Sequence, residues 1–139
     1  MAITTAMCTS FKKELFEAVH DFTSDTFKIA LYDSSATLGA STTAYSTSNE
    51  VSGAGYSAGG VALTIVAPAT DGTTALVDIG DVSWSGATFA ANGALIYNSS
   101  KSNKAVAVLS FGSVQNVSSA NFNITMPTAA AGTAIVRIN

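Results

Sequence analysis

The sequence predicts a mainly β fold, an antiparallel sandwich of jelly-roll type with one helix near its N-terminus. Segments that alternate apolar and polar residues recur roughly every 10 residues, which is typical of sandwiches. Gly, Asn, Asp or Pro stand between these segments, and helical spacing of apolar residues occurs only between Phe11 and Phe22. With 139 residues the chain is long enough for one shared core, so we expect a single domain over residues 1–139.

The first predicted element is a helix over residues 11–22, preceded by an arm over residues 1–10. Five apolar residues recur at helical spacing: Phe11, Leu15, Ala18, Val19 and Phe22. A helix of about three turns is marginal alone and needs a partner surface. We therefore expect it to lie across an open end or edge of the sheet.

A strand and a long loop follow the helix. Phe27, Ile29 and Leu31 alternate with other residues within Asp25–Asp33, which predicts a half-buried strand. Residues 34–60, called the long loop below, show no sustained period of 2 or 3.6. Because long loops in small domains are usually functional or held by a neighbour, we expect this loop to contact a partner subunit.

The remaining strands are shorter and are separated by turn residues. We predict them at Val61–Val66, Thr73–Ile79, Thr88–Ala90, Ala94–Tyr97, Lys104–Phe111, residues 122–126 and Thr133–Asn139. The first should stop at Pro68, and Gly80 should mark a bulge or corner that Trp84 fills. Lys104–Phe111 is apolar on both faces, so this central strand should be covered on both sides.

The composition indicates a surface that faces other proteins. Charged residues make up 11% of the chain, against roughly a quarter in an ordinary soluble domain. We therefore expect a homo-oligomer. The net charge is −3 and the six basic residues form no stripe, which argues against nucleic acid as a partner. No signal peptide or membrane-length apolar run is visible, so we expect no membrane partner and synthesis in the cytoplasm.

The candidates for catalysis or metal binding are weak. His20 is the single histidine, and we expect a structural role near the end of the helix, where a positive charge interacts well with the helix dipole. Asp71, Asp78 and Asp81 are interpreted as solvated turn residues, with a calcium site as the minor alternative. The sequence therefore predicts no enzyme, no catalytic residue, no cofactor and no metal.

The interface candidates are aromatic and charged residues outside the strands. Tyr45 and Tyr56, expected to be exposed in the long loop, could anchor a protein interface or stack on a sugar ring, and we favour the interface. The full set of interface candidates is Phe11, Tyr45, Glu50, Tyr56 and Lys101.

Four segments and a C-terminal strand resemble a family of small virion structural proteins of tailed phages. The segments are FKKELFEAVHDF with DTFKIALYDSSATLGASTTAY, then SNEVSGAGYSAGG, then GALIYNSSKSNKAVAVLSFG, and the strand ends in IVRIN. The resemblance covers most of the chain and brings no catalytic residues. It implies a virion protein, made in the host cytoplasm.

Among virion roles, the resemblance and the uncharged surface favour a capsid decoration or cement protein. Such a protein would lie on the capsid surface, bind the major capsid protein or other virion proteins, and bridge capsomers as a trimer. The long loop, the N-terminal arm and the end of the helix are the predicted contact regions. The alternatives are a tail, baseplate or fibre component that takes part in host attachment, a carbohydrate-binding module, and a hydrolase on a sandwich scaffold.

Overall fold

The structure, a computed structural model, describes residues 2–139 and confirms the mainly β fold with one short helix. Its elements are β1 (Ala6–Met7), α1 (Thr9–Phe16), β2 (Phe27–Tyr32), β3 (Val61–Ala62), β4 (Ile65–Asp71), β5 (Thr74–Ile79), β6 (Val82–Asn98), β7 (Lys104–Ile124) and β8 (Val136–Ile138). The described strands form a five-stranded sheet, in the order β1-β7-β6-β2-β3, and a three-stranded sheet, in the order β4-β5-β8. Every strand pair is antiparallel.

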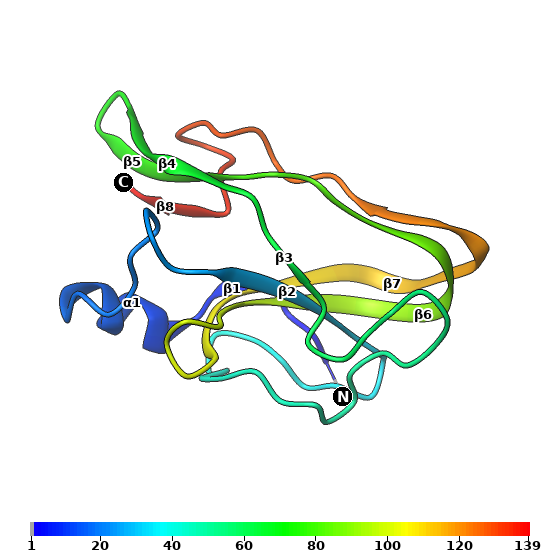
Figure 1. Cartoon of the computed structure of the whole chain (residues 1–139). Helices are drawn as coiled ribbons and strands as arrows, with labels where there is room; N and C mark the ends of the chain where they lie inside the picture. Colours follow the sequence, from blue (N-terminus) through cyan, green and yellow to red (C-terminus); the bar gives the residue numbers. More distant parts are fainter. Residues whose placement is uncertain (1) are drawn as a thin grey trace.

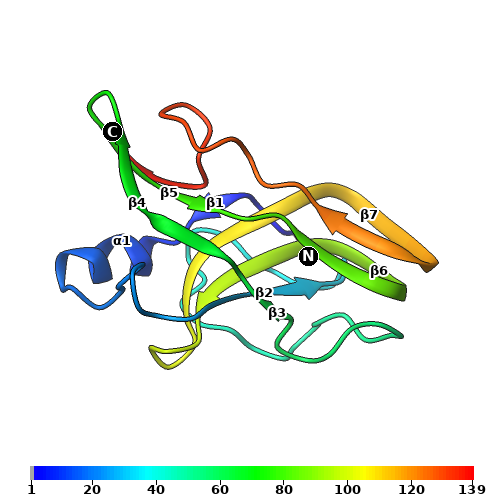
Figure 2. The ribbon, with the colours of Figure 1, turned by 45° about the horizontal axis from the view of Figure 1, so that its top comes forward.

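The hairpin of β6 and β7 connects the two layers of the sandwich. Strand β6 leaves the end of β5, bends, and runs back to end beside β2, and β7 follows it in the opposite direction (Figures 1 and 2). The strand register shifts between Ala91 and Gly93, which pair with Gln115 and Ser110, and Gly112 in this bulge has a φ of 79°. A bulge of this kind bends a strand and increases its twist, so one long hairpin contributes to both layers.

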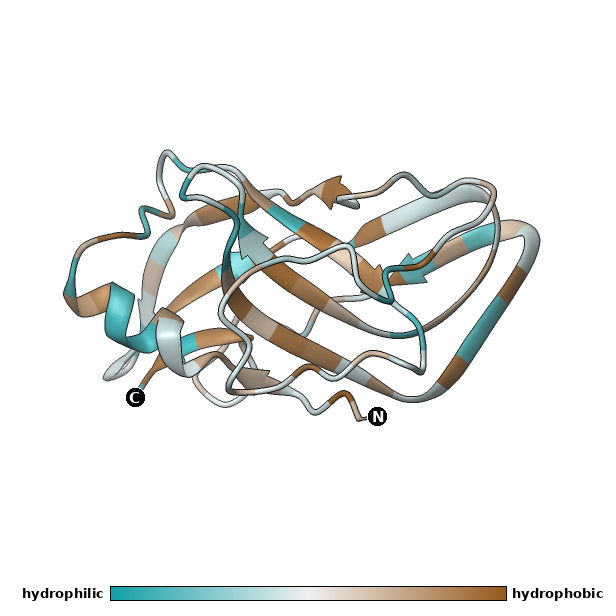
Figure 3. Ribbon diagram, turned by 90° about the horizontal axis from the view of Figure 1, so that it is seen from below, coloured by the Kyte–Doolittle hydropathy of each residue, from teal (hydrophilic) through white to brown (hydrophobic). Residues whose placement is uncertain are grey.

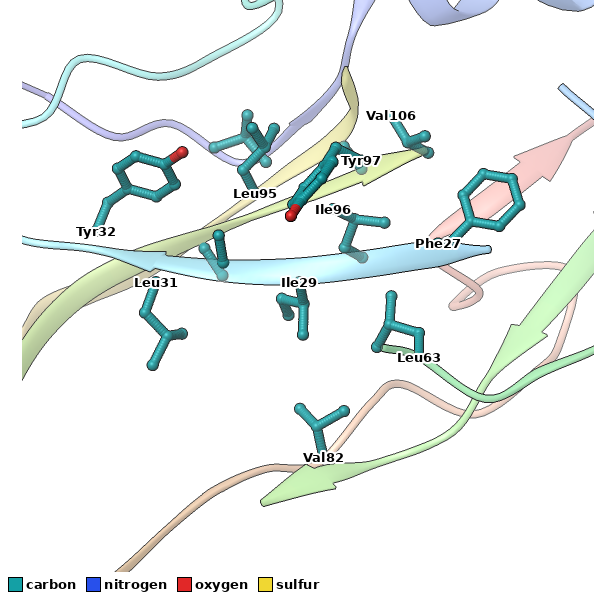
Figure 4. Packing of buried hydrophobic residues seen from close by; sticks show 14 of the residues in the cluster. Phe27, Ile29, Leu31, Tyr32, Leu63, Val82, Leu95, Ile96, Tyr97 and Val106 are labelled. Carbon is teal, nitrogen blue, oxygen red and sulfur yellow. The ribbon is translucent and has the colours of Figure 1, made fainter. Parts of the chain in front are cut away.

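The hydrophobic core lies between the layers. Ile29 and Leu31 of β2 point toward Leu63 and Val82, and all four side chains are buried (Figure 4). The hydropathy colouring shows brown apolar stretches concentrated on β2 and on the adjoining parts of β6 and β7 (Figure 3). The half-buried strand predicted at Asp25–Asp33 is therefore present as β2, but it is buried on both faces.

The long loop covers the other face of the five-stranded sheet as an irregular third layer. It runs beneath β2 and β6 in the view of Figure 1. The N–H of Val51 donates to the carbonyl of Leu31 at 2.9 Å, and the N–H of Ala105 donates to the carbonyl of Thr43 at 3.0 Å. This cover explains why consecutive residues of β7, from Ala105 to Val108, are buried, and it confirms the prediction of a strand covered on both sides.

The helix is shorter than predicted. The sequence indicated residues 11–22, whereas α1 ends at Phe16 and Ala18 takes a left-handed conformation with φ of 57°. The N–H of Val19 donates to the carbonyl of Glu14 at 3.0 Å, which closes the turn. The chain then folds back, so Phe22 packs against Phe11 from outside the helix, with ring centroids 6.0 Å apart.

Several strand predictions are corrected. The strand predicted at Val61–Val66 is divided between β3 and β4, which lie in different sheets, and the strands predicted at Lys104–Phe111 and residues 122–126 belong to one strand, β7. Strand β4 does not stop at Pro68; it continues to Asp71, because Pro68 lies in an edge strand where the register shifts between Val66 and Ala69. Strand β6 is continuous, and Gly86, with φ of 57°, bulges it without ending it. Gly80 does separate β5 from β6, as predicted. Trp84 is buried, but the rings it packs against are those of Tyr56 and Phe122, and its predicted place at the Gly80 corner stays a prediction.

Candidate interaction surface

An apolar groove of about 710 Å³, open to solvent, lies beside α1 and β8. The residues that line it come from β1 and the residue before it, from α1, from the first half of β7 and from the C-terminal segment: Thr5, Ala6, Met7, Lys12, Leu15, Phe16, Ala107, Val108, Leu109, Pro127, Thr133, Ala134, Ile135, Arg137, Ile138 and Asn139. The groove thus lies beside part of the N-terminal arm and beside α1, whereas residues 17–22, the predicted end of the helix, do not line it.

Phe16 is the most exposed large apolar side chain at this groove. Its exposed fraction is 94%, whereas Phe11 in the same helix is completely buried. At about 100° per residue, Phe16 lies about 140° around the helix from Phe11 and cannot share its buried face. Sequence analysis missed Phe16, and its position outside the apolar stripe of the helix is the signal that could have identified it. Since Phe11 is inaccessible, its predicted direct contact with a partner is wrong.

The charged side chains at the groove are both basic. Lys12 extends from α1, and Arg137 extends from β8, with its Nη1 donating to the carbonyl of Ala134 at 2.6 Å. No aspartate or glutamate side chain lines the groove. The charged side chains that line the groove are therefore all cationic, although the chain as a whole carries a net charge of −3.

The loop residues predicted for the interface gather into one cluster on the inner side of the long loop. The Tyr45 hydroxyl donates to Glu50 Oε2 at 2.7 Å, and the Tyr56 hydroxyl donates to Glu50 Oε1 at 2.6 Å. The N–H of Gly59 also donates to Oε1, at 2.7 Å. One carboxylate therefore holds three separate points of the loop together.

The same cluster fastens the loop to the sheet. The N–H of Leu31 in β2 donates to the Tyr56 hydroxyl at 2.9 Å, and the Tyr97 hydroxyl of β6 donates to the carbonyl of Gly59 at 2.7 Å. The ring of Tyr45 stacks on that of Tyr97 with centroids 4.7 Å apart. We call these contacts the Glu50 latch.

Tyr45 and Tyr56 are half-buried, so the expectation of exposed tyrosines is wrong. The ring of Tyr45 stacks on Tyr97, and the ring of Tyr56 packs against Phe89, so both rings make aromatic contacts inside the molecule. The predicted partner contact of Tyr45, Glu50 and Tyr56 stays a prediction. The exposed side of the loop is instead formed by small residues, among them Thr43, Ala44 and Ser48.

Burial shifts the titration of the tyrosines in and beside the latch. Desolvation raises the pKa of Tyr56 and Tyr45 well above the ordinary value, and the hydrogen bonds to the Glu50 carboxylate raise it further. Desolvation also raises the pKa of Tyr32 and of Tyr97. All four tyrosines of the chain thus hold their protons more tightly than free tyrosine does.

His20 has a structural role, but not at the helix terminus where we expected it. It follows the turn after α1, its side chain is fully buried, and its Nδ1 accepts a hydrogen bond from Asn98 Nδ2 at 3.0 Å. Its Nε2 lies 3.0 Å from Glu14 Oε1. The other N–H of Asn98 donates to Asp25 at 2.8 Å. Both ring nitrogens are occupied, so the imidazole joins α1 to the tip of the hairpin.

Lys101, the remaining interface candidate, lies in the turn between β6 and β7. It is solvent-exposed, and its Nζ is 3.9 Å from Asp25. Burial opposes ionisation of Asp25, but the hydrogen bonds from Asn98 and from the N–H of Asp21, together with the Lys101 charge, lower its pKa overall. The structure leaves Lys101 accessible, and its contact with a partner stays a prediction.

The turn aspartates anchor the C-terminal segment. Asp81 accepts a hydrogen bond from the N–H of Met126 at 2.7 Å, and Asp71 accepts one from the N–H of Ala131 at 2.8 Å. Within residues 2–139, no group of three His, Cys, Asp or Glu side chains is placed to hold a metal ion. In the same residues no helix has the length and hydropathy needed to span a membrane.

Comparison of the chain with known protein families, with curated proteins and with solved structures found no match.

Proposed function

We propose that this chain is a structural protein of a phage virion, and that it decorates the capsid by bridging neighbouring capsomers as a homotrimer. The observation that carries the proposal is the open apolar groove with Phe16 exposed beside it. An exposed apolar groove rimmed by polar residues is a candidate site of protein or membrane contact. The resemblance to phage virion proteins and the low content of charged residues favour a protein partner.

The mechanism is burial of surface at many equivalent sites. Apolar burial contributes about 25 cal/mol per Å², from which the entropy lost on association must be subtracted. A single site of this size gives weak binding. A protein with several copies of the site can bridge several shell subunits, and the linked contacts then hold together much more strongly than each does alone.

The direct test is binding to purified capsids that lack the protein. We expect the wild-type chain to cosediment at a fixed number of copies per capsid, and we expect Phe16→Ser to lose most of this binding. The matched control is Val114→Ser, which changes another exposed apolar residue, far along β7 from the groove. Cosedimentation with tails and not with capsids would replace decoration by a tail role, and binding to neither would refute the virion proposal.

A further inference from the structure

The groove has a shape and a chemistry that indicate what occupies it. On one side it is bounded by β8, which pairs with β5 along one edge only. No strand within residues 2–139 pairs with the other edge of β8. The backbone N–H and C=O groups of a free strand edge bind an extended chain by adding it to the sheet.

The two layers also differ in extent on this side. The three-stranded sheet ends at β8, whereas the five-stranded sheet continues through β7 to β1 (Figure 1). Met7 and Leu109 are consequently only partly buried, although they pack against the core. One further strand beside β8 would extend the smaller sheet and cover these side chains.

The charged side chains of the groove indicate which kind of ligand it favours. Lys12 and Arg137 line the groove and no acidic side chain does, so an occupant with a carboxylate is favoured by charge complementarity. Antiparallel pairing of β8 with the β8 of a second copy, centred on Arg137, would place two arginines opposite each other, which is destabilising. An alkyl ligand would leave the β8 backbone unpaired. An acidic extended peptide satisfies the backbone, the apolar lining and the cations together.

We propose that the groove binds an extended segment of a different protein, which pairs with the free edge of β8, places apolar side chains against Met7 and Leu109, and directs an aspartate or glutamate to Arg137 and Lys12. This inference rests on the proposed function and deepens it by giving the chemistry of the partner. A volume of about 710 Å³ accommodates the side chains of a short segment. It falls in the range of about 300–1,000 Å³ that is usual for ligand sites.

The test is a selection of random peptides displayed on a surface, performed against the full chain. We expect enriched peptides to share alternating apolar residues and at least one Asp or Glu. A synthetic peptide of the enriched sequence should bind Arg137→Glu about tenfold more weakly than the wild type. The same peptide with Lys in place of its acidic residue should bind Arg137→Glu better than it binds the wild type. This reversal also shows that the variant is folded, and Val114→Ser should bind like the wild type.

Three results would overturn the inference. The first is a selection without enrichment. The second is a set of enriched peptides that lack acidic residues or that bind Arg137→Glu as well as the wild type. The third is an oligomer in light scattering that Phe16→Ser converts to monomers, because a second copy of the chain would then be the occupant. Capsid cosedimentation, measured separately, distinguishes the two proposals. If capsids bind but the selection fails, only the peptide inference is lost; if the selection succeeds but virion particles do not bind, the virion function is lost.

Discussion

The long loop is irregular but firmly packed on the sheet, whereas the end of helix α1 is regular but exposed to solvent. The loop has almost no regular structure, yet the Glu50 latch and backbone hydrogen bonds to β2 and β7 hold it against the sheet. The helix is regular, yet its last residue, Phe16, is 94% exposed. Irregular backbone is therefore not a sign of a loosely held segment in this protein. The exposed apolar side chain of Phe16 makes the groove the better candidate for a contact surface.

The largest effect should follow from adding a methyl group where the loop meets β2. Gly60 has φ of +72°, and a Cβ at this position would overlap the carbonyl oxygen of Ile29. We expect Gly60→Ala to lower the free energy of unfolding by at least about 3 kcal/mol, measured by urea denaturation. Gly72→Ala is the matched control, since Gly72 has φ of +60° but open space around it, and should cost about 1 kcal/mol. Equal effects of the two substitutions would show that the loop is not packed on the sheet.

The next effect should come from the latch itself. Glu50→Ala leaves the hydroxyls of Tyr45 and Tyr56 and the N–H of Gly59 without their acceptor, and we expect a loss of about 3 kcal/mol in urea denaturation. Glu50→Gln should lose less than about 1.5 kcal/mol, because the amide oxygen still accepts and the Tyr45 hydroxyl can rotate to accept from the new amide. A loss under 0.5 kcal/mol for Glu50→Ala, on the scale of about ±0.5 kcal/mol for ordinary surface changes, would mean that the latch is not formed.

Alkaline titration tests, without any mutation, whether the long loop is packed on the sheet or flexible. The folded-state pKa of each tyrosine is raised above the unfolded value of about 10. Their contribution to stability is therefore fully present below about pH 10 and is lost as the pH rises through the folded-state values. We expect tyrosinate absorbance to appear only together with the loss of the β circular dichroism signal. Tyrosinate that forms near pH 10 in a native-like protein would contradict the buried arrangement.

The smallest effect on stability should be found at the helix end. Phe16 makes little contact with the rest of the chain, so Phe16→Ser should change the free energy of unfolding by no more than about 0.5 kcal/mol. The loss of stability should be much smaller than in Glu50→Ala, because Glu50 supports the fold whereas the Phe16 side chain is exposed. A large loss of stability in Phe16→Ser would show that the groove is part of the core.

The strands were predictable wherever alternation and turn residues agreed. Strands β2 and β5 show both the alternation and the flanking turn residues. Strand β6 did not, because Gly86 and the pair Asn92-Gly93 have the composition of turns but occupy bulges and paired positions within one bent strand. The helix end was also hidden, since Ala18 takes a left-handed conformation that Gly or Asn usually occupies.

The interaction surface was only partly predictable. The arm and the helix end were predicted as contact regions, but the groove joins residues near position 10 to residues near position 135, and periodicity contains no information about such a contact. The Glu50 latch could not be predicted from the sequence for a related reason. Tyr45, Glu50 and Tyr56 point inward from irregular backbone, so their spacing follows no period that reveals a buried face.

Hydrogen exchange of the protein, free and bound to capsids, tests the comparison most directly. We expect amides of the long loop between Tyr45 and Gly60 to be protected already in the free protein and to change little on binding. New protection should appear at residues 5–16 and 127–138, on the two sides of the groove. A free protein whose loop exchanges like an unfolded chain, with protection gained there and not at the groove, would contradict the account.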